Sequence, residues 1–166
     1  MKKSFLIILS LITCISLHSQ NLSLVKFKIC GNAIEGIIFP NTYIYNGHLV
    51  FDECKSRFTP TLLEVKHAEI FLMSNNSKIE YIDMGSLYKP RDLHKILKTF
   101  RRQYVGYINN SEDSIIVIHA LNFKERGSKK AFDDWGKNYI IAYDGFYENN
   151  MVTFSINLTK HIVSIP

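Results

Sequence analysis

The C-terminal half of the chain is dominated by short segments with the alternation of β-strands, separated by short polar connections. From Val152 to Leu158 every second residue is apolar, and the residues between them are Thr, Ser and Asn. This alternation is typical of a strand buried on one face. Because a parallel crossover needs a dozen or more residues, the short connections predict antiparallel neighbours. We expect an antiparallel sheet with strands at Tyr104–Ile108, Ser114–Phe123, Asn138–Tyr143, Met151–Leu158 and His161–Ile165.

Two further segments in the N-terminal half also favour extended structure. Leu24–Ile29 alternates apolar and basic residues, which predicts a half-buried strand. Tyr43–Tyr45 and His48–Phe51 flank an Asn-Gly pair, the dipeptide that favours a type I′ turn. Ile115–Ile118 is apolar at every position, so we expect this strand to lie at the centre of the sheet. The sequence therefore predicts an N-terminal β-hairpin region and a central C-terminal strand.

Helices are predicted in two places. Thr61 and Glu64 have the spacing of a capping box before Leu62–Met73, which we predict to be helical, with a strand as the alternative. Pro90 suits the first position of a second helix, Pro90–Gln103, whose apolar residues recur every three or four positions. Together these elements predict an α+β fold: two helices packed on one face of a curled antiparallel sheet.

The first 19 residues have the pattern of a secretory signal. Lys2 and Lys3 precede an apolar run from Phe5 to Leu17, which is too short to span a membrane. We expect a signal peptide at residues 1–19, a single α+β domain at 20–166 and no transmembrane segment. The net charge of +5 would fall to +3 on removal of the two lysines. The protein is expected to be periplasmic or secreted; lipidation at Cys14, giving an anchored envelope protein, is the alternative.

Removal of the signal would leave two cysteines, Cys30 and Cys54. An even pair in an oxidising compartment predicts a disulfide between them. Two inert buried thiols, or a reactive thiol, are the alternatives.

Basic residues gather on one face of the second predicted helix. At 100° per residue, Arg91, Lys95, Lys98 and Arg102 fall opposite the apolar side. This ridge is either a solvated face or a binding face for an acidic partner. Trp135, the single tryptophan, lies in the long polar stretch Lys124–Lys137, which predicts either a lid over the sheet edge or a contact loop. These five residues are the candidates for partner binding.

Catalytic and cofactor motifs are not found in the sequence. It contains no His-Glu-X-X-His metal motif, no Gly-X-Ser-X-Gly elbow and no phosphate-binding glycine loop, so we expect neither a metal nor a cofactor. His119 shares a strand face with apolar residues and is more typical of a core histidine than of a base. Asp133 and Asp134 lie in a polar loop, where acids are usually solvated. Nucleic acid is a disfavoured partner, because the mature charge is small and the protein is expected to be exported.

The apolar leader ending in Ser19-Gln20, and the run Phe100–Asn109 followed by a strand and a later Trp135, resemble small exported proteins of Bacteroidota with no established activity. This resemblance implies no catalytic residue. The leading hypothesis is an exported, non-catalytic binding or inhibitor-like module of the cell envelope, of immunity type, that recognises an acidic partner. The alternative is a small envelope hydrolase with a site assembled from His119, Asp133 and Asp134.

Overall fold

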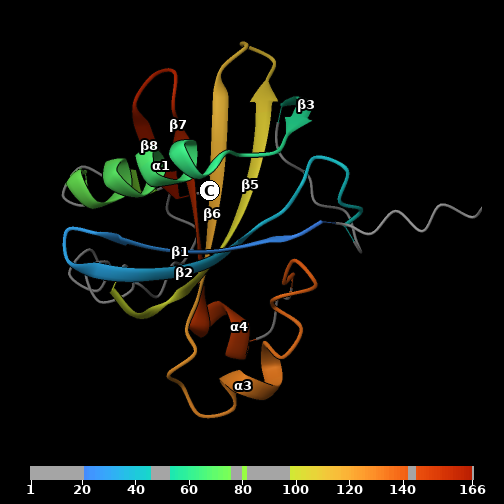
Figure 1. The fold of residues 1–166 in the computed structure, drawn as a ribbon, viewed down its shortest axis with the longest axis vertical. Helices are drawn as coiled ribbons and strands as arrows, with labels where there is room; N and C mark the ends of the chain where they lie inside the picture. The colour runs from blue at the N-terminus through green and yellow to red at the C-terminus, as the bar shows by residue number, and fades with distance from the viewer. Residues whose placement is uncertain (1–20, 46–52, 76–79, 82–97, 142–144, 166) are drawn as a thin grey trace, which may run out of the picture.

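The computed structural model describes residues 21–45, 53–75, 80–81, 98–141 and 145–165, and these form an α+β fold built on one sheet (Figure 1). The strands of the sheet run in the order β1-β2-β5-β6-β7-β8-β4, and β3 pairs with β5 beside β2. Most neighbours are antiparallel; β2 with β5 and β4 with β8 are parallel. The strands are β1 (Ser23–Ile29), β2 (Asn32–Ile38), β3 (Cys54–Phe58), β4 (Glu80–Tyr81), β5 (Arg101–Asn109), β6 (Ser114–Leu121), β7 (Met151–Asn157) and β8 (Ile162–Ile165).

The predicted antiparallel order of the C-terminal strands is confirmed. β5 pairs with β6, β6 with β7 and β7 with β8, each antiparallel. The strand predicted at Asn138–Tyr143 is wrong for its described part, because 138–141 has no strand structure and 142–143 lies outside the described residues. The backbone of this segment is instead held by side chains: the amide of Ile140 donates to the side chain of Gln103.

β6 is the central strand, as its apolar sequence predicts, and both of its faces are buried. Ile116, Ile118 and Ala120 pack in the larger core cluster, together with residues of α1 (Leu62–Ser74). Ile115 and Val117 point to the other face, where a smaller cluster includes side chains from the segments 39–45 and 135–139. The sheet therefore has a helix on one face and irregular chain on the other.

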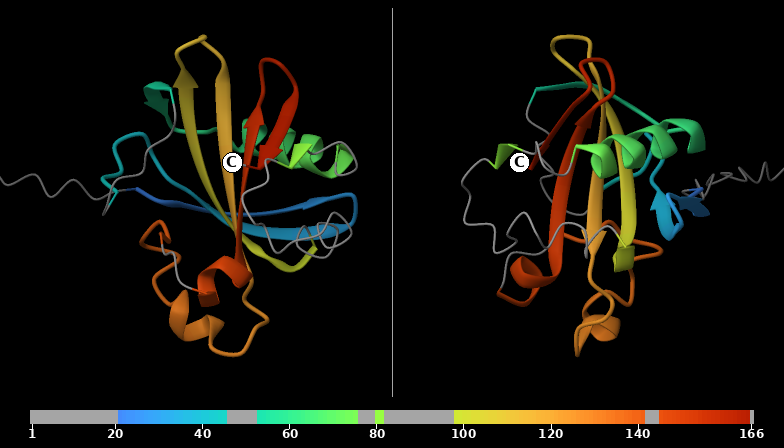
Figure 2. Two further views of the ribbon diagram at one scale, coloured as in Figure 1. Left: turned by 180° about the vertical axis from the view of Figure 1, so that it is seen from behind. Right: turned by 90° about the vertical axis from the view of Figure 1, so that its left-hand side faces the viewer.

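α1 is confirmed as a helix with the expected start. The Thr61 side chain accepts from the Glu64 backbone, and the Glu64 carboxylate accepts from the Thr61 amide at 2.7 Å. The packing of two helices on one face is not confirmed. In Figures 1 and 2, α1 lies over the sheet, whereas the short α3 (Ser128–Ala131) and α4 (Gly145–Asn150) lie together beyond one end of it.

The second predicted helix does not extend to Gln103. Only Lys98 and Thr99 are helical among its described residues, residues 90–97 lie outside them, and the chain enters β5 at Arg101. The prediction failed because the spacing of four between Phe100 and Tyr104 also places both residues on the same side of a strand. Both pack in the larger core cluster.

β1 and β2 form a hairpin that the sequence analysis did not identify as one. Its turn residues, Cys30 and Gly31, have φ values of 49° and 80°, as a type I′ turn requires. The hairpin predicted around Asn46-Gly47 has its turn outside the described residues, and Tyr43–Tyr45 is not a strand.

The disulfide predicted between Cys30 and Cys54 is absent, and both thiols are free. Cys30 lies at the tip of the β1–β2 hairpin, whereas Cys54 begins β3 and pairs with Asn109 at the far end of β5. In Figure 1 the hairpin tip lies at the left of the molecule and β3 at its upper right. A disulfide needs Cα atoms within about 7 Å, and this topology keeps them far apart.

Within the described part of the chain, no helix combines the length and the hydropathy that crossing a membrane would require. The predicted signal at residues 1–19 and the alternative lipidation site at Cys14 lie outside the described residues.

Candidate functional site

A groove with basic walls lies where the β1–β2 hairpin passes the beginning of β5. Its volume is about 460 Å³. Apolar side chains form part of its lining, and the charged lining residues are four cations and one acid. We call this the basic groove; its described lining is Lys26, Phe27, Lys28, Ala33, Ile34, Glu35, Lys98, Thr99, Phe100, Arg101 and Phe123.

Strand pairing brings the charged residues of the basic groove together. Lys26 lies opposite Glu35 in the β1–β2 register, and their side chains form an ion pair at 3.3 Å. Glu35 also pairs with Arg101, whose Nε lies 3.1 Å from the carboxylate. Since β2 runs parallel to β5 with Gly36 opposite Arg102, Glu35 reaches the start of β5 directly.

Arg101 contacts two aromatic rings as well as Glu35. Its guanidinium carbon lies 4.4 Å from the centroid of Phe123 and 4.8 Å from that of Trp135. The two rings meet edge to face at 5.6 Å. These cation–π contacts restrict the movement of the guanidinium, and a guanidinium can bind a carboxylate with two parallel hydrogen bonds.

Of the predicted partner-binding residues, Lys98 lines this groove and Trp135 lies next to it. Lys98 is exposed. Trp135 is only half-exposed and packs against the smaller core cluster, and its backbone carbonyl accepts a hydrogen bond from Nε2 of Gln103 at 2.7 Å. Arg91 and Lys95 lie outside the described residues. The structure thus supports the lid interpretation of the 124–137 segment, with Phe132 fully buried.

Arg102, which was predicted to bind a partner, is not on the surface. It lies on β5 rather than on a helix surface, and none of its surface is exposed. Its Nε donates to Glu69 of α1 at 3.0 Å, and Tyr104 donates to the same carboxylate oxygen at 3.0 Å. A buried charge requires a partner of this kind, so the role of Arg102 is to join α1 to the sheet.

His119 is a core histidine, as the sequence analysis favoured. It is 6% exposed, its Nδ1 lies 2.8 Å from the hydroxyl of Thr153, and its ring stacks on Tyr139. Burial lowers the pKa of His119 to about 4. The imidazole is therefore neutral at pH 7.

Asp133 and Asp134 line a second hollow, of about 250 Å³, whose described lining includes Tyr139 and Tyr147 but not His119. Both acids are exposed. The structure therefore does not place the three residues of the hydrolase hypothesis around one cavity. Within the described residues, no group of three or more His, Cys, Asp and Glu could hold a metal ion.

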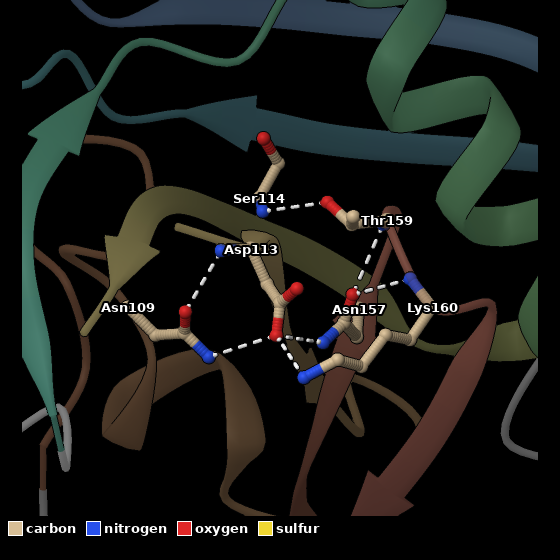
Figure 3. A network of polar contacts seen from close by, with 6 residues as sticks. All are labelled: Asn109, Asp113, Ser114, Asn157, Thr159 and Lys160. Carbon is tan, nitrogen blue, oxygen red and sulfur yellow. Dashed lines mark hydrogen bonds and ion pairs between the residues drawn. The ribbon is translucent and has the colours of Figure 1, made fainter. Parts of the chain in front are cut away.

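A third polar cluster joins the β5–β6 turn to the β7–β8 turn (Figure 3). One carboxylate oxygen of Asp113 accepts from Asn109 at 3.2 Å and Asn157 at 3.1 Å, and pairs with Lys160 at 2.7 Å. The amide of Asp113 in turn donates to the Asn109 side chain at 2.8 Å. These contacts satisfy the polar groups of two turns, so we assign the cluster a structural role.

The basic groove could not be found from the sequence, because its charges come from distant segments. Lys26, Lys28 and Glu35 lie in the N-terminal hairpin, and Arg101 lies more than 60 positions further along the chain. The alternation of lysines in β1 indicated an exposed face, but only the parallel pairing of β2 with β5 brings that face beside Lys98 and Arg101. Comparison with protein-family models, curated proteins and solved structures gives no match.

Proposed function

We propose that this protein is an exported, non-catalytic binding module of the cell envelope, of inhibitor or immunity type, that holds an acidic segment of a partner protein in the basic groove. The observation that carries the proposal is the excess of cations around an open groove. Lys28 and Lys98 are exposed, and neither has an ion-pair partner among the described residues. A groove with an excess of positive charge attracts acidic ligands and raises their rate of association.

A protein partner fits this groove better than a nucleic acid does. The described lining of the groove holds four cations with Glu35 among them, whereas nucleic-acid sites follow a long backbone with many phosphate contacts. The apolar part of the lining also suits side chains of a polypeptide. Export rests on the signal-like leader at residues 1–19.

Titration calorimetry with a ten-residue peptide of glutamate and glycine tests the proposal. We expect binding at low salt that weakens at least tenfold at 0.5 M NaCl, because exposed charges are screened. The double variant Lys28→Gln, Lys98→Gln should lose this binding and keep its melting temperature, since both side chains are exposed. The matched control is Lys129→Gln, Lys130→Gln, which removes two exposed lysines of α3.

Equal binding by the double variant and the α3 control would overturn the proposal. So would equal binding of a glutamine and glycine peptide, because the groove would then not recognise charge. Vesicles containing anionic lipid provide the comparison for a membrane: binding to vesicles without binding to the peptide would also reject a protein partner.

A further inference from the structure

We infer that the partner segment bound by the basic groove carries a large apolar side chain next to a carboxylate, and that this carboxylate takes the place of Glu35 on Arg101. The inference rests on the proposed function and adds to it the kind of sequence that is recognised. In this inference, Glu35 competes with the ligand carboxylate for Arg101.

The apolar part of the lining requires an apolar group in the ligand. Phe27 and Phe123 are half-buried and supply exposed apolar surface to the cavity, whereas Ile34 and Phe100, at 3% and 7% exposed, add little to it. The volume of about 460 Å³ lies within the range of small-molecule pockets and exceeds what a lone carboxylate would need. A ligand made only of charges would leave this apolar surface against water, whereas an aromatic or branched side chain would cover it.

Arg101 provides a fixed partner for the ligand carboxylate. The rings of Phe123 and Trp135 lie 4.4 and 4.8 Å from its guanidinium carbon, and Glu35 is its carboxylate partner among the described residues. A guanidinium positioned in advance loses little freedom when it binds, which is the condition for a strong carboxylate contact. The position of Glu35 therefore marks where a ligand carboxylate would lie.

Glu35 can be displaced at small cost. Its side chain is 31% exposed, and that of its other partner, Lys26, is 67% exposed. Ion pairs at such exposed sites contribute little to stability, so exchanging Glu35 for a ligand carboxylate leaves the fold intact. When displaced, Glu35 keeps Lys26 as its partner, and its charge is not left alone.

Four peptides of equal length test the inference by titration calorimetry. Two are acidic and two have every glutamate replaced by glutamine; one of each pair carries a central phenylalanine and the other carries alanine there. We expect the acidic phenylalanine peptide to bind at least tenfold more tightly than the acidic alanine peptide. It should also change the fluorescence of Trp135, the single tryptophan, which contacts Arg101. Phenylalanine does not interfere with that signal.

The variant Glu35→Gln tests the competitor role. We expect it to bind the acidic phenylalanine peptide at least threefold more tightly, with an unchanged melting temperature. The matched control, Glu148→Gln, removes an exposed acid of α4 outside the groove and should leave the affinity unchanged. An unchanged or weaker affinity in Glu35→Gln would overturn the competitor role.

The peptide series separates failure of this inference from failure of the proposed function. Equal affinity of the two acidic peptides would reject the apolar anchor and leave recognition of acidic segments standing. If the glutamine peptide with phenylalanine bound as tightly as its acidic counterpart, or if no peptide bound, both the proposed function and this inference would be rejected.

Discussion

Arg102 on β5 and Glu69 on α1 form an ion pair at 3.0 Å, and neither side chain has any exposed surface. Glu69 occupies an inward position of α1, beside Val65, Ala68 and Leu72, where an apolar residue would be expected. Tyr104 donates a second hydrogen bond to the carboxylate, and Arg102 also donates to the carbonyl of Phe100 at 2.6 Å. The pair therefore fixes which face of α1 meets which end of β5.

We predict that Glu69→Leu destabilises the protein by about 3–5 kcal/mol, because it leaves the Arg102 guanidinium buried without its carboxylate. The double variant Glu69→Leu, Arg102→Met should recover most of this loss, since no charge is then buried. Urea denaturation of both variants gives the two free energies of unfolding. Lys55→Gln, which breaks an exposed pair with Glu112, is the control and should change stability very little. A double variant no more stable than the single one would contradict the prediction.

The pair also illustrates how far the sequence could predict this structure. α1, β1, β5 from Tyr104 onwards and β6 to β8 follow from local pattern: a capping box for α1 and alternating or continuous apolar residues for the strands. β3 is largely polar, and β2 contains Gly36, so neither has a clear alternating pattern. Arg102 was predicted to lie on the exposed basic face of a helix and to bind a partner, because local spacing does not record its ion-pair partner 33 residues earlier in the chain.

The candidate site was harder to predict than the strands, because it too depends on contacts between residues far apart in the chain. Lys98 was identified from the sequence, but the groove that it lines needs the β1–β2 hairpin, which reaches it only through three parallel pairs between β2 and β5. The segment of Trp135 was interpreted as either a lid or a contact loop, and the ring of Trp135 packs on Arg101 and Phe123. Long-range pairing, absent from any local pattern, determines both positions.

His119 makes the free energy of unfolding depend on pH below neutrality. The folded protein has this pKa lowered from 6.5 to about 4, so the unfolded chain takes up a proton first as the pH falls. The free energy of unfolding should therefore decrease by about 3 kcal/mol between pH 7.5 and pH 4 from this residue alone. His119→Gln should lack this part of the decrease when urea denaturation is repeated across that range. His67→Gln, on the exposed face of α1, is the control. Parallel curves for wild type and His119→Gln would contradict the burial effect.

Asp113 should also make the folded protein less stable as the pH falls, but at lower pH than His119. Its pKa is lowered, first by the hydrogen bond from Lys160 and then by those from Asn157 and Asn109. The unfolded chain therefore binds a proton near pH 4 while folded Asp113 stays ionised, and the stabilisation present above pH 4 is lost as the pH falls through the folded pKa. We expect Asp113→Asn to lower the melting temperature at pH 6 and the difference from wild type to shrink towards pH 2. A difference that stays constant with pH would show that the charge of Asp113 is not involved.

Gly36 permits the close pairing of β2 with β5 on which the basic groove depends. A Cβ atom at this position would lie 2.5 Å from Cε2 of Tyr104 and 3.0 Å from the backbone oxygen of Arg102. Tyr104 is fully buried and hydrogen-bonded to Glu69, so its ring cannot move aside freely. We predict that Gly36→Ala costs about 1–3 kcal/mol of stability through overpacking. The same variant should weaken binding of acidic peptides, because Glu35 and the β1–β2 hairpin would move away from Arg101.

Gly136→Ala is the matched control, since no heavy atom lies within 4 Å of its added Cβ. If the two variants unfold at the same urea concentration, the close contact at Gly36 does not limit the pairing of β2 with β5.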